Sequence, residues 1–327
     1  MKVNSALRRD HRRRWIALAC AMICLVAGAS LTRASDSETA AVPDGAGRDI
    51  RVKDDNDREV RLSRPAERII CLYGAYNEIL AAMGLESRLV GRTKADDLPP
   101  SIRSKPSVGT HMRPNIELVL ELKPDLIIQG AGRRQAMATV DQLRNHGIQV
   151  AVFNPVTFSE LFAVITRMGT LTGAEGAAAA LIASMQSRLE VVEKKIAVVS
   201  SRPRVFFEVR YPNLLASGSK SIVHDVIKRA GGENVTPSDK RFVRIGMEAL
   251  IGKYPDVYVV QKGPMNPNPG NPTGRPHYDV VRAVTEKRIL MVDEQVFSRP
   301  GPRSADAVEE LFGFLHGDRR GSGTEGP

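Results

Sequence analysis

Apolar and polar positions follow two different periods along most of the chain. Residues 50–63 contain two runs of period-two alternation around Asp-Asn-Asp, which predicts a β-hairpin. Short apolar runs then alternate with segments of helical period, which is typical of a parallel sheet with helices on both faces. We expect strands at 68–73, 88–93 and 148–154, helices at 77–84 and 133–147, and a short helix running into a strand at 117–128.

From residue 158 the period is helical alone. One helix is predicted at 158–173, ending at Gly173, and a second at 174–200 without a breaker after Gly176. Some 25 residues at about 1.5 Å per residue give a rod of roughly 35–40 Å. Such a helix is long for a globular domain, and it suits a rigid connection between two lobes.

After Ser201 the alternation of strands and helices resumes. We expect strands at 204–209 and 288–292, helices at 221–232 and 304–317, and a second helix-to-strand phrase at 248–260. The predicted fold class is therefore α/β, with two α/β lobes that have central, mainly parallel sheets and are joined by a long α-helix.

One phrase occurs in both lobes. "ELVLELKPDLII" begins at Glu117 and "EALIGKYPDVYVV" begins at Glu248, and each Glu is followed seven residues later by Pro-Asp and an apolar strand. A carboxylate in the first turn of a helix stabilises it by some tenths of a kcal/mol. The alternative is that both carboxylates project from one face of the protein and bind arginines of a partner.

The N-terminus has the three parts of a secretory signal peptide. A basic start precedes an apolar run of 17 residues at 15–31, and small residues follow. An uncleaved membrane anchor is the alternative. The predicted organisation is a signal peptide (1–34), a flexible linker (35–49), an N-terminal lobe (50–157), a helical segment (158–201), a C-terminal lobe (202–317) and a disordered tail (318–327), with the mature protein in the periplasm.

Removal of the leader changes the charge and the cysteine count. Residues 1–34 carry seven Lys/Arg and one acid, so their loss lowers the formal net charge from +10 to +4. A mildly basic protein gives no reason to expect nucleic acid as a partner. Cys71 becomes the only cysteine, so no intramolecular disulfide can form.

The loops that follow the predicted strands are rich in arginine and tyrosine. In open α/β sheets ligands bind beyond the carboxyl ends of the strands, and an Arg/Tyr lining favours an anionic ligand with flat or metal-chelating groups. Each arginine taken singly could equally be a solvated surface residue. The predicted ligand-binding residues are Tyr73, Tyr76, Arg92, Arg113, Arg133, Arg210, Tyr211, Lys262, Arg275 and Tyr278.

Motifs for catalysis and cofactors are not found. Gly130-Ala131-Gly132 follows a strand, but Gln135 stands where a dinucleotide loop needs its third glycine, and no phosphate-binding GxxxxGK[ST] or GxSxG stretch occurs. His111, His224 and His277 could meet as metal ligands, although their spacing does not require it. We predict neither catalytic residues nor a resident metal or cofactor.

The chain resembles the periplasmic substrate-binding proteins of ABC importers for ferric siderophores, haem and cobalamin. The resemblance covers residues 50–317 and rests on six segments in order, namely "IRVKDDNDREVRL", "ERIICLYGAYNEILAAMGLESRLVGRT", "VGTHMRPNIELVLELKPDLII", "AGGENV", "GMEALIGKYPDVYVV" and "RPGPRSADAVEELFGFLHG". It implies two lobes joined by a long helix. It also implies that Glu117 and Glu248 form salt bridges with arginines of the permease subunits.

Departures from the family pattern bear on the ligand. Tyr73-Gly74-Ala75 stands where many relatives have Ser-Pro-Ser, and the mature chain lacks the tryptophans that often line cobalamin sites. The resemblance therefore implies a metal-containing anionic ligand, with a ferric siderophore or haem ahead of cobalamin or an oxyanion such as molybdate. The predicted function is that of a monomeric solute-binding component of an ABC transporter. A secreted two-lobed enzyme and a sensor module using the same site are the alternatives.

Overall fold

The structure is a computed structural model that describes residues 49–130 and 134–317. All of these described residues belong to one compact unit. The predicted leader, the linker up to residue 48, Arg133 and the predicted tail lie outside the described residues. Within the described ranges, no helix is both long and apolar enough to cross a membrane. The predicted limits of signal peptide, lobes and tail stay predictions.

The predicted hairpin is confirmed. Strands β1 (Ile50–Lys53) and β2 (Glu59–Leu62) pair antiparallel, with Ile50 opposite Leu62. Their alternate side chains are buried and exposed, as the period-two pattern requires.

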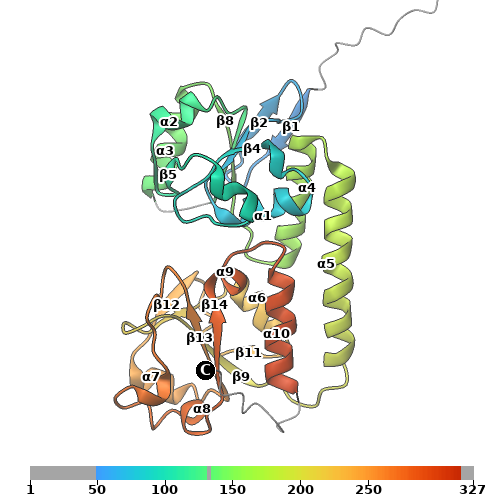
Figure 1. Ribbon diagram of the computed structural model, residues 1–327. Helices are drawn as coiled ribbons and strands as arrows, with labels where there is room; N and C mark the ends of the chain where they lie inside the picture. Colours follow the sequence, from blue (N-terminus) through green and yellow to red (C-terminus); the bar gives the residue numbers. More distant parts are fainter. Residues whose placement is uncertain (1–48, 131–133, 318–327) are drawn as a thin grey trace, which may run out of the picture. The chain divides into compact units, whose positions relative to one another are not determined.

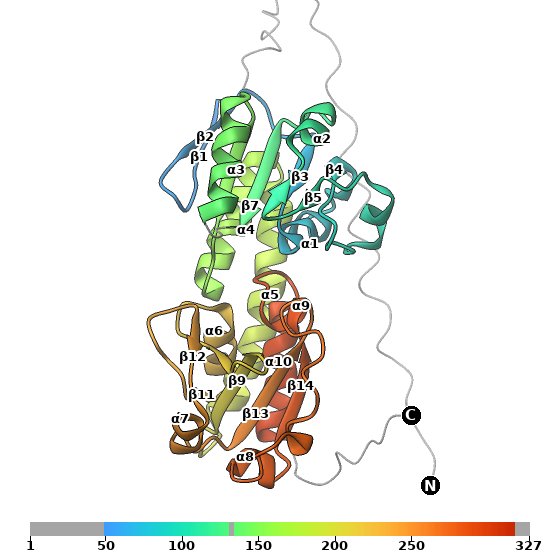
Figure 2. The ribbon, with the colours of Figure 1, turned by 90° about the vertical axis from the view of Figure 1, so that its left-hand side faces the viewer.

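The N-terminal lobe is built on a four-stranded parallel sheet. Its strands lie in the order β4-β3-β7-β8, so β3 and β7 are central (Figure 2). The predicted strands are confirmed with bounds a few residues shorter, at β3 (Ile69–Cys71), β4 (Leu89–Gly91), β7 (Leu126–Gly130) and β8 (Gln149–Phe153).

Successive side chains of these strands enter two different cores. Ile69, Ile128 and Phe153 pack with helices α1 (Gly74–Ala82) and α4 (Phe158–Thr172). Ile70 and Ile127 pack on the other face with α2 (Ile116–Glu121) and α3 (Arg134–Asn145). A sheet covered on both faces explains why its strands are continuous apolar runs.

Four short elements between α1 and α2 were not predicted, because they are too brief to show a period. The 3₁₀ turn η1 (Glu86–Arg88) precedes β4. The 3₁₀ turn η2 (Pro100–Ser104) and the antiparallel pair β5 (Gly109–Thr110) and β6 (Arg113–Pro114) follow it and bring the chain from the end of β4 to the start of α2.

The C-terminal lobe has a mixed sheet in the order β12-β10-β9-β13-β14, with β11 also paired to β9. The three long strands are parallel, as expected: β9 (Arg204–Arg210), β13 (Val257–Lys262) and β14 (Ile289–Asp293). The sequence did not indicate β10 (Leu215–Ser217), β11 (Glu233–Asn234) or β12 (Phe242–Arg244), which have two or three residues each. β10 pairs antiparallel with both β9 and β12.

Helices cover both faces of this second sheet. Helices α6 (Ile222–Arg229), α9 (Glu294–Phe297) and α10 (Ser304–His316) share a core with Val205, Phe207 and Val259. On the other face, α7 (Met247–Gly252), α8 (Arg282–Thr285) and the 3₁₀ turn η3 (Pro272–Gly274) lie near Phe206 and Tyr258.

The predicted long helix is α5 (Glu175–Ile196), whose 22 residues span about 33 Å. It is slightly shorter than expected because the chain turns after Ile196, where Val198 is exposed and has no core to enter. Helix α5 packs against α4 of the N-terminal lobe and against α6 and α10 of the C-terminal lobe (Figure 1). Arg188 of α5 is ion-paired with Asp306 and Glu309 of α10.

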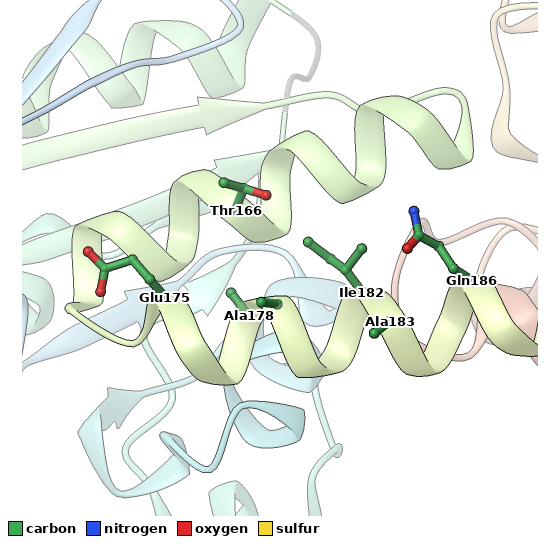
Figure 3. A pocket seen from close by; sticks show the side chains of 7 residues that line it. Thr166, Glu175, Ala178, Ile182, Ala183 and Gln186 are labelled. Carbon is green, nitrogen blue, oxygen red and sulfur yellow. The ribbon is translucent and has the colours of Figure 1, made fainter.

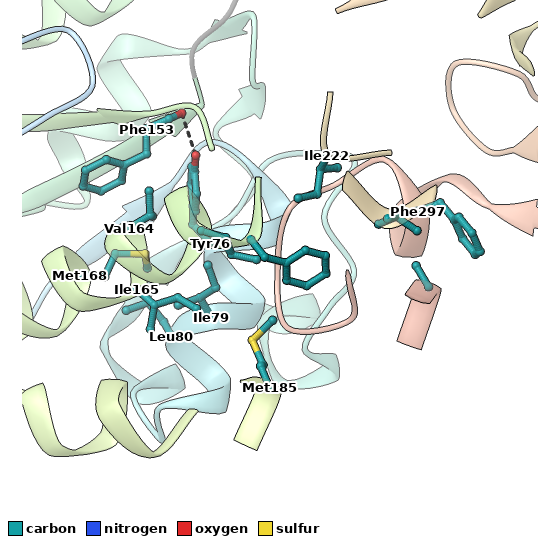
Figure 4. Close-up of a cluster of buried hydrophobic side chains, with 14 of the residues drawn as sticks. Tyr76, Ile79, Leu80, Phe153, Val164, Ile165, Met168, Met185, Ile222 and Phe297 are labelled. Atoms are coloured by element: carbon teal, nitrogen blue, oxygen red, sulfur yellow. Dashed lines mark hydrogen bonds between the residues drawn. The ribbon is translucent and has the colours of Figure 1, made fainter. Parts of the chain in front are cut away.

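One hydrophobic core therefore continues from lobe to lobe. Tyr76 of α1, Met185 of α5, Ile222 of α6 and Phe297 of α9 belong to the same buried cluster (Figure 4). At the start of α4, the backbone N–H of Phe158 donates to the carboxylate of Asp225 in α6, 2.8 Å away.

A buried ion pair organises the Pro/Asn-rich loop after β13. Glu208 lies in the middle of β9 and is fully buried, and both of its oxygens accept hydrogen bonds from Arg275, at 2.6 and 2.9 Å. Arg275 also donates to the carbonyl of Pro269, and its guanidinium lies 4.0 Å from the Tyr211 ring centroid. Tyr278 packs beside it and is 4% exposed.

Arg275 and Tyr278, which the sequence predicts to bind the ligand, thus have partners inside the protein, and their contact with a ligand stays a prediction. Arg275 is 8% exposed and its charge is already neutralised by Glu208. A carboxylate inside an apolar strand requires a buried cation as its partner. The two residues fix the loop to the sheet, and neither presents a free polar group at the surface.

We expect Arg275→Met to lower the free energy of unfolding by about 3–5 kcal/mol, because Glu208 would stay buried without its partner. Urea denaturation measures this change. The matched control is Arg282→Met, which breaks ion pairs to Asp256 and Glu286 at the surface and should cost much less. Equal losses in the two variants would contradict the role given to the Glu208–Arg275 pair.

Candidate functional site

The carboxyl ends of the strands in the N-terminal lobe converge on Tyr73 and Asp96. Tyr73 is half-buried and directly precedes α1, while Asp96 follows β4 and is 4% exposed. Asp96 accepts a hydrogen bond from the Thr93 hydroxyl at 2.7 Å, and the Asn77 amide nitrogen lies 3.5 Å away. Burial raises the pKa of the Asp96 carboxyl above its ordinary value, although the Thr93 hydroxyl and nearby cations act in the opposite direction.

Arg299 of the C-terminal lobe reaches this position. Its Nη1 atom lies 3.7 Å from Oδ1 of Asp96, and its guanidinium carbon lies 6.0 Å from the Tyr73 ring centroid. A Cβ atom at Gly74 would come within 2.5 Å of Asp96 and 2.7 Å of Arg299. A side chain at position 74 would therefore displace the end of the Asp96 or the Arg299 side chain from its present position.

A second ion pair ties the same segment to α1. Arg303 donates to both oxygens of Glu78, at 2.6 and 2.8 Å, and the two side chains are mostly buried. Residues 298–303, between α9 and α10, thus contact the N-terminal lobe through two arginines. These contacts fix where the strand ends of the two lobes meet.

The strand ends of the C-terminal lobe are held by a network of buried polar groups. Gln261, in β13, donates to the carbonyl of Val209 and accepts from the Ser298 hydroxyl. Glu294 is 6% exposed and accepts a hydrogen bond from the Met265 N–H at 2.6 Å. Burial raises the pKa of the Glu294 carboxyl, and the charge of Arg299 partly offsets this effect.

We call Tyr73, Asp96, Gln261, Glu294 and Arg299 the strand-end junction. It combines an aromatic ring, a guanidinium and two buried carboxylates from both lobes. An anionic group could bind Arg299 in competition with Asp96, and a flat group could stack on Tyr73. The sequence pattern pointed to Tyr73 alone among these five residues. Asp96 lies in an irregular loop, and Arg299 lies in the quoted "RPGPR" segment, where no periodicity marks either.

The other residues predicted in the N-terminal lobe are placed differently. Tyr76 is 1% exposed, and its hydroxyl donates to the carbonyl of Phe153 at 2.8 Å (Figure 4). Its ring and hydroxyl both have partners inside the protein, and its contact with a ligand stays a prediction. Arg92 is half-buried and donates to the carbonyls of Thr93 and Asp96. Arg113 is exposed in β6.

The predicted residues of the C-terminal lobe are spread over several positions. Tyr211 is half-buried beneath Arg275. Arg210 is exposed and lies opposite Leu215 in the sheet. Lys262 is exposed and lines a surface hollow of about 420 Å³ formed with residues 267–271 and Met291. For these three and for Arg92 and Arg113, ligand binding remains a prediction.

The three histidines considered as metal ligands do not form a site. Among the described residues, no group of three or more His, Cys, Asp or Glu side chains could hold a metal ion. His224 instead lies 3.3 Å from the Asn234 amide, and burial lowers the pKa of its imidazole. Cys71 is fully buried, and burial raises the pKa of its thiol well above the ordinary value, as for an inert thiol.

The two repeated glutamates occupy matching positions. Glu117 is exposed in the first turn of α2, where the Asn115 side chain caps the helix by accepting from the N–H of Leu118. Glu248 is exposed in the first turn of α7, which follows Gly246. Both carboxylates are thus exposed, each in the first turn of a six-residue helix.

A shallow groove also runs between α4 and α5. It has a volume of about 230 Å³ and is lined by Thr166, Glu175, Ala178, Ala179, Ile182, Ala183 and Gln186 (Figure 3). Small alanine side chains let the two helices approach closely and leave this depression.

The structure combines two α/β lobes with parallel strands, one continuous core and a long shared helix, which is the architecture that the sequence predicts for a two-lobed solute-binding protein. The sequence profile of the periplasmic binding protein family matches residues 69–310. The chain belongs to this family.

Individual relatives are similar over most of their length. An uncharacterised ABC transporter substrate-binding lipoprotein of Bacillus subtilis is 28% identical over 82% of this chain and 86% of its own. A vitamin B12-binding protein of Vibrio cholerae is 26% identical over 77% of this chain and 90% of its own. The crystal structure of a periplasmic vitamin B12-binding protein of Vibrio cholerae superposes with a TM-score of 0.67, at 25% identity, over 77% and 97% of the two chains.

The raised pKa of Asp96 predicts a pH-dependent effect of Asp96→Asn on stability. The Asp96 carboxyl binds its proton more tightly in the folded protein than in the unfolded chain. The free energy of unfolding of the unsubstituted protein therefore falls as the pH rises from 3.8 through the raised pKa of the folded state. We expect the free energy of unfolding of the variant, relative to the unsubstituted protein, to increase as the pH rises above 3.8. Urea denaturation across this range measures the difference. A difference that is constant with pH would contradict the placement of Asp96.

Proposed function

We propose that this protein is the solute-binding component of an ABC importer and that it captures a small, anionic, metal-containing ligand at the strand-end junction. The observation that supports the proposal is the position of Arg299 between the two lobes. In a family of solute-binding proteins, this cation of one lobe lies against an aromatic ring and a buried carboxylate of the other. A ligand with an acidic group and a flat surface fits these side chains.

The candidate ligands are ferric siderophores, haem, cobalamin and oxyanions. The residues favour a ferric siderophore or haem, because tyrosine can bind iron or stack on a flat ring. The vitamin B12-binding relatives add weight to cobalamin, which therefore belongs in the first group to be tested. The metal would arrive with the ligand, and the proposal includes neither a resident cofactor nor a catalysed reaction.

The protein would act outside the cytoplasm, in the periplasm. Lipoprotein and periplasmic relatives support an extracytoplasmic location, and the predicted signal peptide would direct the export. The partner is the permease of the importer, which would contact Glu117 of one lobe and Glu248 of the other. No specific observation favours the secreted enzyme or the sensor module.

The ligand is identified by a thermal-shift panel on the purified mature protein, together with its absorbance spectrum. The panel contains haem, cyanocobalamin, ferric hydroxamate and catecholate siderophores, and molybdate. A compound that binds only the folded form at 100 times its dissociation constant stabilises the protein by about 2.7 kcal/mol, and so raises the melting temperature. We expect one class to do so, and Arg299→Met to abolish the shift. A panel without any shift would contradict the proposed ligand class.

The docking role predicts a separation of binding from uptake. We expect Glu117→Ala combined with Glu248→Ala to leave the affinity for the ligand unchanged and to abolish uptake of that ligand by the strain that carries the gene. Neither carboxylate lies at the strand-end junction, whereas an arginine of the permease would lose its partner. The control is Glu121→Ala, which removes another exposed carboxylate of α2. Uptake at the normal rate by the double variant would refute the docking assignment.

A further inference from the structure

The two helices that carry Glu117 and Glu248 are too short to be stable by themselves. Helices α2 and α7 have six residues each, and isolated helices of that length do not persist in water. The directions of the two carboxylates therefore depend on what fastens each helix to its lobe.

In the N-terminal lobe this fastening is an arginine. Arg68 precedes β3, and its guanidinium donates to the carbonyl of Leu122, the C-cap of α2, at 2.6 Å and to the carbonyl of Lys123 at 3.0 Å. These carbonyls belong to the end of a helix, where no intrahelical donor remains. The Asp125 carboxylate accepts from the backbone N–H of Arg68 at 3.0 Å, and the Asp125 N–H donates to the Arg68 carbonyl at 2.9 Å.

The C-terminal lobe repeats the arrangement with different residues. Arg204, at the start of β9, donates twice to the carbonyl of Lys253, the C-cap of α7, at 2.9 and 3.2 Å. The Asp256 carboxylate accepts from the Arg204 N–H at 2.8 Å, and the Asp256 N–H donates to the Arg204 carbonyl at 2.8 Å. The residue after each C-cap, Lys123 or Tyr254, has a φ of +48°.

The repeated Pro-Asp thus has a structural partner that the sequence did not show. Arg68 and Arg204 are 136 residues apart, whereas the two phrases are offset by 131, so no single offset relates all the parts. Arg68 directly precedes β3 and Arg204 begins β9, each an inner strand of its lobe's sheet, and each arginine fixes the end of a helix whose first turn carries a docking glutamate. An arginine therefore holds the C-terminal end of both α2 and α7. These are the two helices whose carboxylates must keep a fixed direction in the proposed function.

We propose that Arg68 and Arg204 are positioning residues for permease docking, which hold α2 and α7 so that Glu117 and Glu248 can be engaged together. This inference rests on the proposed function. A charge-assisted hydrogen bond to an otherwise unpaired carbonyl is stronger than a neutral one. Without it, a six-residue helix can shift or open at its C-terminal end, and the two carboxylates lose their fixed spacing.

The chain supplies a matched control. Arg88 also donates to two backbone carbonyls, those of Ala66 and Thr172, at 2.9 and 2.7 Å, but neither belongs to α2 or α7. Arg88→Met therefore removes the same number of charge-assisted hydrogen bonds from the N-terminal lobe as Arg68→Met. It leaves the docking helices untouched.

The experiment measures binding of the mature protein, labelled with radioactive methionine, to right-side-out membrane vesicles from the strain that carries the gene. We expect Arg68→Met and Arg204→Met each to raise the dissociation constant, and the double variant to raise it about tenfold or more, which is the fold-change for loss of a hydrogen bond to a charged group. Arg88→Met should leave it unchanged. Arg68→Lys and Arg204→Lys, which keep one donor and the charge, should recover part of the affinity.

Two further readouts separate positioning from general destabilisation. Hydrogen exchange should accelerate for the amides of α2 in Arg68→Met and for those of α7 in Arg204→Met, and for neither helix in Arg88→Met. Arg88 is less exposed than Arg68, so Arg88→Met should lower the melting temperature at least as much as Arg68→Met. If the double variant does not fold, vesicle binding is compared among the single methionine variants and the lysine variants. Unchanged vesicle binding in both methionine variants, or an equal loss in Arg88→Met, overturns this inference. Normal vesicle binding by the Glu117→Ala, Glu248→Ala protein overturns the docking function and this inference with it.

Discussion

The packing of one helix against both lobes is the constraint on which the rest of the structure depends. Helix α5 contacts α4, which precedes it in the chain, and α6 and α10, which follow it, so the two lobes share a single hydrophobic core. Interiors are close-packed, and a large hinge motion would have to break this core. Small displacements of the strand ends are compatible with it.

This shared core explains why residues of both lobes come into contact at the strand-end junction. Asp96 and Arg299 are 203 residues apart, yet they lie 3.7 Å from each other because both lobes are anchored to α5. Arg303 and Glu78 reinforce the same approach. The junction is therefore a built feature of the fold, in which a guest anion would replace one buried carboxylate as the partner of a guanidinium.

The sequence predicted the elements well and the junction poorly, for a physical reason. Long strands such as β9 and long helices such as α5 show a regular hydrophobic period in the sequence. The repeated glutamates stand in two similar sequence segments, so they too can be recognised from neighbouring residues alone. Buried and exposed arginines or tyrosines look alike in a sequence. Arg275 and Tyr76 were consequently expected at a ligand, although Glu208 and the carbonyl of Phe153 satisfy them in the interior. Asp96 and Arg299 acquire their role only through contacts between distant segments.

The most direct test of the account is a crystal structure of the mature protein with the ligand that the thermal-shift panel identifies. We predict that the bound molecule contacts Tyr73 or Asp96 from one lobe and Arg299 or Gln261 from the other, with the guanidinium of Arg299 turned toward an acidic group of the ligand. A ligand bound within one lobe only, or in the groove between α4 and α5, would contradict the central claim that the strand ends of both lobes form the site.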